Sequence, residues 1–198
     1  MLPPEHKTAE LQELEQLMRL SGEGLLTFPP LRDEDHQLIG AYIQIYNFIE
    51  LNLRRCVEIF VTVGMLPGVN SRKVHSAELV SSVKAAIAAM SADDENIEEA
   101  MARLDEIELR RPFRNLFAHW AGRRFPNHDA VVFVTKDERD SERVHGETLG
   151  KDRASTAVMK LSDLRGLMVH MADHEQWIAV KTSEWHNRFM QNQAEEEC

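Results

Sequence analysis

The sequence predicts a mainly α fold: a bundle of four or five helices with a small β-hairpin inserted before the last helix. Two observations support this prediction. Apolar residues recur at alternating three- and four-residue steps through most of the chain, which is the period of an amphipathic helix. One β-branched and aromatic run, residues 130–135, interrupts that period and is typical of a strand.

Residues 1–30 are predicted to form a short helix and a linker that dock on the main body. Leucines and a methionine at helical spacing, with glutamates between them, indicate an amphipathic helix from Glu5 to Arg19. The run Phe28-Pro29-Pro30 indicates an extended connection, because proline disfavours helical backbone in the residue before it.

The second predicted helix has the clearest pattern. Either Asp33 or Asp35 can cap its beginning, and Val63-Gly64 ends it. Its apolar stripe comprises Ile39, Tyr42, Tyr46, Ile49, Leu53, Val57 and Phe60. A stripe of this length without a helix breaker indicates the central helix of a bundle.

Two more helices are predicted before the hairpin. The third covers Ser71 to Met90, and the fourth starts near Asp94. We expect the fourth to continue to Gly122, which would close it, while Pro112 either starts or kinks its last part.

The hairpin is predicted over about residues 129–161, with strands at 130–135 and 154–161 and a charged, glycine-punctuated connection. Ser162-Asp163 is expected to cap a long last helix. Residues 191–198 read as a frayed tail, so the helical domain as a whole is predicted to cover residues 31–190.

Composition limits the classes of function. A net charge of -10 argues against a general nucleic-acid coat protein, although a local basic cleft can still focus the field on a small target. The chain has no apolar run that would span a bilayer and no basic-then-apolar leader. Its two cysteines, Cys56 and Cys198, suggest no disulfide framework, so we expect a cytoplasmic protein without membrane partners.

Residues 110–124 are the most informative stretch, because they hold several arginines and no acid. On a helix, Arg111, Asn115 and His119 follow each other at four-residue steps on nearly one face. Arg114 lies about 140° round the axis from His119 on a straight helix. The two can converge only if the arginine side chain swings across, if the helix bends at its proline, or if a second chain contributes one of them.

Asn115 joins Arg114 and His119 in the pattern Arg-Asn-x-x-x-His. This pattern resembles the motif of the HEPN superfamily (higher eukaryotes and prokaryotes nucleotide-binding domains). The resemblance implies a compact helical bundle, often a homodimer, and in many members a metal-independent endoribonuclease without cofactor. In that family such hydrolases often serve as toxins of toxin–antitoxin pairs or in phage defence, which implies a possible inhibitory partner protein.

The resemblance assigns catalytic roles to three residues. His119 would deprotonate the ribose 2′-hydroxyl or protonate the leaving 5′-oxygen. Arg114 would stabilise the charge that develops on the phosphorane. Asn115 would fix the imidazole tautomer or hold the phosphate. The product would be a 2′,3′-cyclic phosphate, which requires RNA.

The other arginines of the stretch are predicted to bind RNA: Arg110, Arg111, Arg123 and Arg124. The alternative is a solvated face whose arginines pair with the nearby Glu106 and Glu108. A second alternative concerns function: a non-catalytic HEPN-like helical dimer that binds nucleotide, RNA or a protein partner through the same face.

Residues outside the motif give weaker indications. Glu50 or Asn47 could hold the motif arginine, or Glu50 could simply pair with Arg54 on the helix surface. His170 and His174 have a spacing that can hold zinc, but a third ligand is needed and the sequence indicates none, so no metal is predicted.

Three aromatic residues lie beside the motif. Phe113 and Phe117 are expected in the core, whereas Trp120 could pack there or stack on a base.

Overall fold

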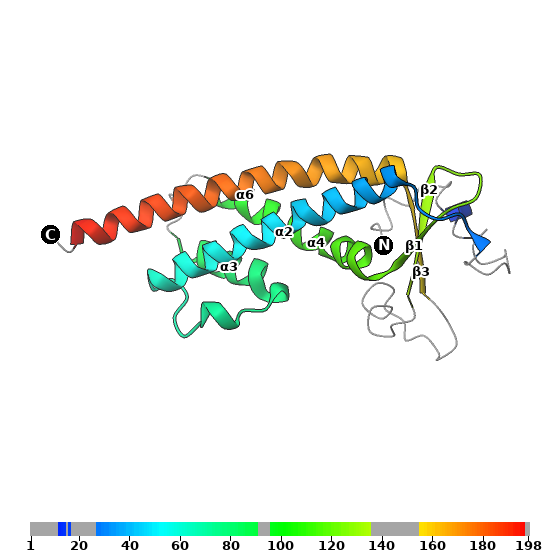
Figure 1. The fold of residues 1–198 in the computed structure, drawn as a ribbon. Coiled ribbons are helices and arrows are strands. Elements are labelled where there is room, and N and C mark those ends of the chain that lie inside the picture. Colours follow the sequence, from blue (N-terminus) through cyan, green and yellow to red (C-terminus); the bar gives the residue numbers. More distant parts are fainter. Residues whose placement is uncertain (1–11, 15, 17–26, 91–95, 136–154, 197–198) are drawn as a thin grey trace. The chain divides into compact units, whose positions relative to one another are not determined.

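The computed structural model describes residues 12–14, 16, 27–90, 96–135 and 155–196. The fold is mainly helical with a small antiparallel sheet before the last helix, which confirms the predicted class (Figure 1). The helices are α2 (Asp33–Thr62), α3 (Leu79–Ala88), α4 (Ile97–His119) and α6 (Leu161–Glu196), with 3-10 turns η3 (Ser71–Lys73) and η4 (Ser76–Glu78). In this described part, none of the helices combines the length and apolar character that a membrane crossing requires.

The chain folds into two compact units. The first unit comprises Met1–Ile43 and Arg111–Val169, and the second comprises Gln44–Arg110 and His170–Cys198. Each of α2, α4 and α6 therefore contributes residues to both units. The predicted tail from residue 191 is still helical as far as Glu196.

The sheet of the first unit has three strands in the order β1-β2-β3: β1 (Ala121–Arg124), β2 (Ala130–Thr135) and β3 (Ser155–Lys160). The predicted hairpin is present as β2 and β3, which pair antiparallel from Ala130 opposite Lys160 to Thr135 opposite Ser155. The additional strand is β1, which pairs antiparallel with β2.

The prediction that Gly122 closes the helix of the motif is wrong. The helix ends at His119, and Gly122 lies in β1 opposite Phe133. A β-carbon at Gly122 would lie 2.8 Å from Cδ1 of Leu31 and 3.3 Å from Cε1 of Phe133. The glycine is therefore explained by close packing in a sheet rather than by a helix end.

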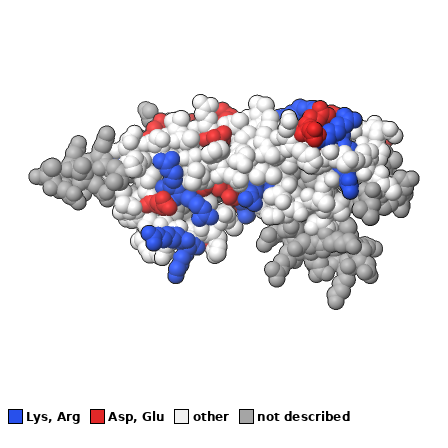
Figure 2. Space-filling view, viewed as in Figure 1, with Lys and Arg blue, Asp and Glu red and all other residues white. Residues whose placement is uncertain are grey.

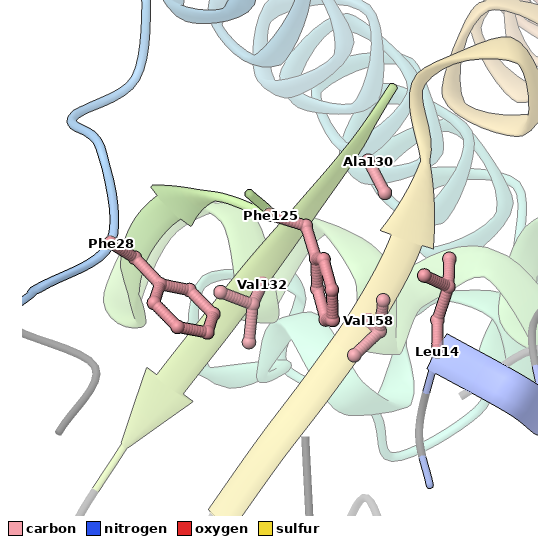
Figure 3. Packing of buried hydrophobic residues seen from close by; sticks show 6 residues of the cluster. All are labelled: Leu14, Phe28, Phe125, Ala130, Val132 and Val158. Carbon is pink, nitrogen blue, oxygen red and sulfur yellow. The ribbon is translucent and has the colours of Figure 1, made fainter. Parts of the chain in front are cut away.

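One face of the sheet packs on the residues that precede α2. Figure 3 shows the side chains gathered there: Leu14, Phe28, Phe125, Ala130, Val132 and Val158. The rings of Phe28 and Phe125 meet edge to face with centroids 5.6 Å apart. Leu14 belongs to the predicted N-terminal helix, whose remaining residues mostly lie outside the described ranges.

The opposite face of the sheet packs on helices. Phe133 of β2 contacts Phe117 of α4 with ring centroids 5.2 Å apart, and Phe117 contacts Tyr42 of α2 at 5.0 Å. Since β2 is buried on both faces, it needs apolar side chains at successive positions. That requirement explains the unbroken apolar run by which the sequence marked it as a strand.

The second unit packs α2 against the other helices. The hydroxyl of Tyr46 donates to the carbonyl of Ile107 at 3.1 Å, and the rings of Phe60 and Trp185 lie 5.3 Å apart. Leu53 is fully buried, in agreement with the predicted stripe of α2, and so are Leu104 of α4 and Ile178 of α6. Burying side chains of this size supplies most of the favourable free energy of such a bundle.

The predicted third helix begins later than expected. Val74 is extended, with φ -68° and ψ 120°, so residues 71–78 form η3 and η4 and α3 starts at Leu79. Local hydrogen bonds favour these turns. The side chain of Asn70 accepts the backbone N–H of Arg72, and the side chain of Glu78 accepts the backbone N–H of His75.

Candidate functional site

The motif residues lie on the last turns of α4, in the first unit. His119 is the last residue of the helix and is exposed, whereas Arg114 and Asn115 are half-buried. The buried residues of the same turns are Phe113, Leu116, Phe117 and Trp120. The catalytic candidates are therefore not part of the buried face, but of the three only His119 is exposed.

Direct contacts join only part of the motif. Nη1 of Arg114 donates to Oδ1 of Asn115 at 3.4 Å, which is a long hydrogen bond. Within the described residues, the His119 side chain forms no hydrogen bond or ion pair with the side chain of either of them. Pro112 lies inside α4 and does not end it. The angular separation of about 140° between Arg114 and His119 therefore applies to this helix as to any regular one.

The four predicted RNA-binding arginines have different environments. Arg111 and Arg123 belong to the first unit and are half-buried. Arg110 belongs to the second unit, where its Nη2 donates to Oε2 of Glu106 at 3.2 Å. This is the carboxylate with which the alternative interpretation paired it.

Arg124 has an environment different from that of the other three arginines. Its side chain is buried, and Nη1 lies 3.3 Å from Oδ1 of Asp35 and 3.2 Å from Oδ1 of Asp129. A buried guanidinium that already has two carboxylates is poorly placed to receive a phosphate. We therefore leave Arg124 out of the RNA-contacting set. From sequence, a structural arginine within an arginine run looks the same as a binding one.

Asp35 also caps α2. Its Oδ2 accepts the backbone N–H of Arg32 at 2.8 Å, and its own N–H donates to the carbonyl of Arg32 at 3.0 Å. This reciprocal pair satisfies a backbone donor at the helix start. Of the two predicted capping aspartates, Asp35 therefore forms the capping contact, in a position that is 1% exposed.

Trp120 packs in the core. Only 6% of its surface is exposed, similar to Phe117. Of the two roles left open by the sequence, the structure supports the packing role.

Glu50 and Asn47 lie on the part of α2 that belongs to the second unit, and both are half-buried. Their proposed role in holding Arg114, a residue of the first unit, stays a prediction. The other partner considered for Glu50 is Arg54, whose guanidinium donates to the Val74 carbonyl and the Ser76 hydroxyl, at 3.1 Å each.

On the face drawn in Figure 2, the described basic and acidic side chains lie interspersed. Two surface hollows of the first unit, about 340 and 280 Å³ in volume, share His128 and Asp129 in their linings. Neither is lined by Arg114, Asn115 or His119, so the motif lies outside both.

A second group of side chains, whose atoms could bind a metal ion, lies in the second unit. Glu106 of α4 approaches the histidine pair His170 and His174 of α6. The histidine spacing is visible in the sequence, but nothing in the sequence shows that a glutamate more than sixty residues earlier lies beside it.

Comparison with known proteins gives no match: no family model, no curated protein and no solved structure is similar to this chain. The assignment to the HEPN superfamily therefore remains a resemblance that rests on the motif and on a mainly helical frame.

Proposed function

We propose that this protein is a metal-independent endoribonuclease of HEPN type. One observation carries the proposal: the Arg-Asn-x-x-x-His motif lies on the last turns of α4, where Arg114 and Asn115 are half-buried and the terminal histidine is exposed. Histidine is the side chain best suited to give and take protons near neutrality, and an exposed one can reach an RNA strand.

The proposed reaction is an internal transesterification. The ribose 2′-oxygen forms a bond to phosphorus, and the bond from phosphorus to the 5′-oxygen breaks. His119 takes the proton of the 2′-hydroxyl or supplies one to the 5′-oxygen, and Arg114 stabilises the additional negative charge on the phosphoryl oxygens. Asn115, which accepts from Arg114, would orient that guanidinium or hold the phosphate.

A homodimer is part of the proposal. Arg114 and His119 lie about 140° apart round one helix, so a site that uses both is most simply completed by two copies. Arg111 and Arg123, both partly exposed, would contact the RNA backbone. The cytoplasm, a role as toxin or phage-defence effector, and an inhibitory partner protein follow from the resemblance.

The test is cleavage of a structured RNA by the purified full chain in excess chelator. Arg114→Ala and His119→Ala are compared with the unmutated protein and with the exposed controls Arg55→Ala and His36→Ala. We expect 2′,3′-cyclic phosphate ends, a loss of at least a hundredfold in both motif variants, and full activity in the controls.

The opposite result would redirect the proposal. If the unmutated protein binds RNA in a salt-sensitive way but leaves it intact, the alternative of a non-catalytic HEPN-like helical module is favoured. If His119→Ala retains full activity, the chemistry assigned to the motif is wrong.

A further inference from the structure

Three side chains in the second unit point metal-ligating atoms at a common centre. Nε2 of His170 lies 3.1 Å from Nε2 of His174 and 3.6 Å from Oε2 of Glu106. The ligand atoms of the three residues all lie within 4.8 Å of one another. Two of the three residues are one turn apart on α6, and the third comes from α4, so two helices hold the group.

Two of these separations are close to those of a tetrahedral zinc site. Zinc binds histidine nitrogen and carboxylate oxygen at about 2.0–2.2 Å, so two ligand atoms of a tetrahedron lie about 3.3–3.5 Å apart. The two separations from His170, 3.1 and 3.6 Å, fall on either side of that range. The ligand atoms of Glu106 and His174 lie within 4.8 Å of each other, so side-chain rotation would bring all three onto one ion.

The burial of the group also suits a bound ion. His174 is 3% exposed, so its imidazole is shielded from bulk water. An imidazole binds a metal through the lone pair of its unprotonated nitrogen. Within the described residues, Nδ1 of His174 is buried without a hydrogen-bond partner, whereas its Nε2 lies 3.1 Å from Nε2 of His170.

The carboxylate is oriented by a neighbour. Nη2 of Arg110 donates to Oε2 of Glu106 at 3.2 Å, which leaves this carboxylate oxygen further lone-pair capacity. The adjacent Asp173 is engaged elsewhere, since its Oδ2 accepts from Nη1 of Arg103 at 2.7 Å. Glu106 is therefore the acid that faces the histidine pair.

We propose that Glu106, His170 and His174 form a zinc site with three protein ligands. Two histidines and one glutamate are a donor set that zinc uses when its fourth position is left to water or a small ligand. The site differs from the RNA motif in its residues and in the unit that holds it. It does not depend on the proposed ribonuclease activity, which needs no metal.

The test is zinc titration of the full chain after treatment with chelator and removal of the chelator. Isothermal calorimetry measures the affinity and stoichiometry, and cobalt substitution reports the coordination by visible absorption. We expect one ion per chain, a higher melting temperature with zinc, and an intense cobalt spectrum of tetrahedral type.

Variants decide whether these residues are the ligands. His170→Ala and Glu106→Gln are expected to weaken zinc binding at least tenfold, while the exposed His186→Ala on the same helix binds as the unmutated chain does. Circular dichroism checks that each variant is folded. Absence of zinc binding by the unmutated chain, or unchanged affinity in folded His170→Ala and Glu106→Gln, would overturn the proposal.

The two proposals are separated by the motif variants. Arg114→Ala and His119→Ala are expected to bind zinc normally, whether or not the unmutated protein cleaves RNA. A zinc affinity that fell with these two variants and not with His170→Ala would contradict the assignment.

Discussion

The guanidinium of Arg124 lies 3.3 Å from the carboxylate of Asp35, and both side chains are almost fully buried. The same carboxylate accepts the backbone N–H of Arg32 at the start of α2. One buried ion pair thus connects β1 of the sheet to the first turn of α2.

Arg124→Ala should destabilise the protein strongly, because it leaves the carboxylate of Asp35 buried without its charge partner. Removing one partner of such a pair costs about 3–5 kcal/mol. Arg123→Ala, at the half-buried neighbouring position, should lose at most about 1 kcal/mol. Urea unfolding followed by circular dichroism measures the free energy of unfolding of both variants. Equal losses would show that the buried ion pair contributes no more than the half-buried Arg123.

Two glycines should respond to alanine with opposite signs. Gly166 lies inside α6 with no atom within 4 Å of an added β-carbon, so Gly166→Ala should stabilise by about 0.5–1 kcal/mol. Gly122→Ala should destabilise by about 1 kcal/mol, since its β-carbon would displace Leu31. Thermal melts of the two variants test this, and stabilisation by both would show that Leu31 moves aside freely.

The Cys56 thiol should be unreactive in the folded protein. Burial raises its pKa from 9.0 to about 12, and Sγ lies 3.1 Å from the Thr182 hydroxyl, whose own proton goes to the Ile178 carbonyl at 2.6 Å. In a Cys198→Ser background, a thiol reagent at pH 8 should react only after denaturant is added. Rapid reaction without denaturant would contradict the burial.

The same raised pKa has a consequence for stability. Between pH 9 and 12 the folded protein retains a proton that the unfolded chain releases, so Cys56 contributes a loss of stability as pH rises above about 9. Cys56→Ala should make stability fall less steeply over that range. Unfolding curves at pH 8 and pH 10 compare the two proteins, and an identical slope would rule out this contribution.

A composite active site should be restored by mixing two inactive variants. If Arg114 of one chain works with His119 of the other, heterodimers of Arg114→Ala and His119→Ala contain one intact site. After subunit exchange, about a quarter of the unmutated activity should return. A mixture that stays inactive despite demonstrated exchange would place both residues of a site in the same chain.

Periodicity predicted the helices and the hairpin well, because each buried face repeats along the chain. It could not predict β1, since Gly122 is as plausible at a helix end as in a strand, and only the approach of Leu31 distinguishes them. The late start of α3 depended on hydrogen bonds of Asn70 and Glu78, which compete with a continuous helix.

The motif was predicted from its spacing, and the exposure of His119 is consistent with that reading. The buried partners of Arg124 and the approach of Glu106 to His170 could not be predicted. Both contacts join residues far apart in the sequence, and the periodicity of apolar residues carries no information about such contacts.

Because α2, α4 and α6 each contribute to both units, neither unit is one continuous stretch of the chain. A recombination breakpoint inside residues 44–169 would therefore divide both units at once. Neither unit can be exchanged with a relative as one continuous cassette, because a segment of the other unit interrupts it.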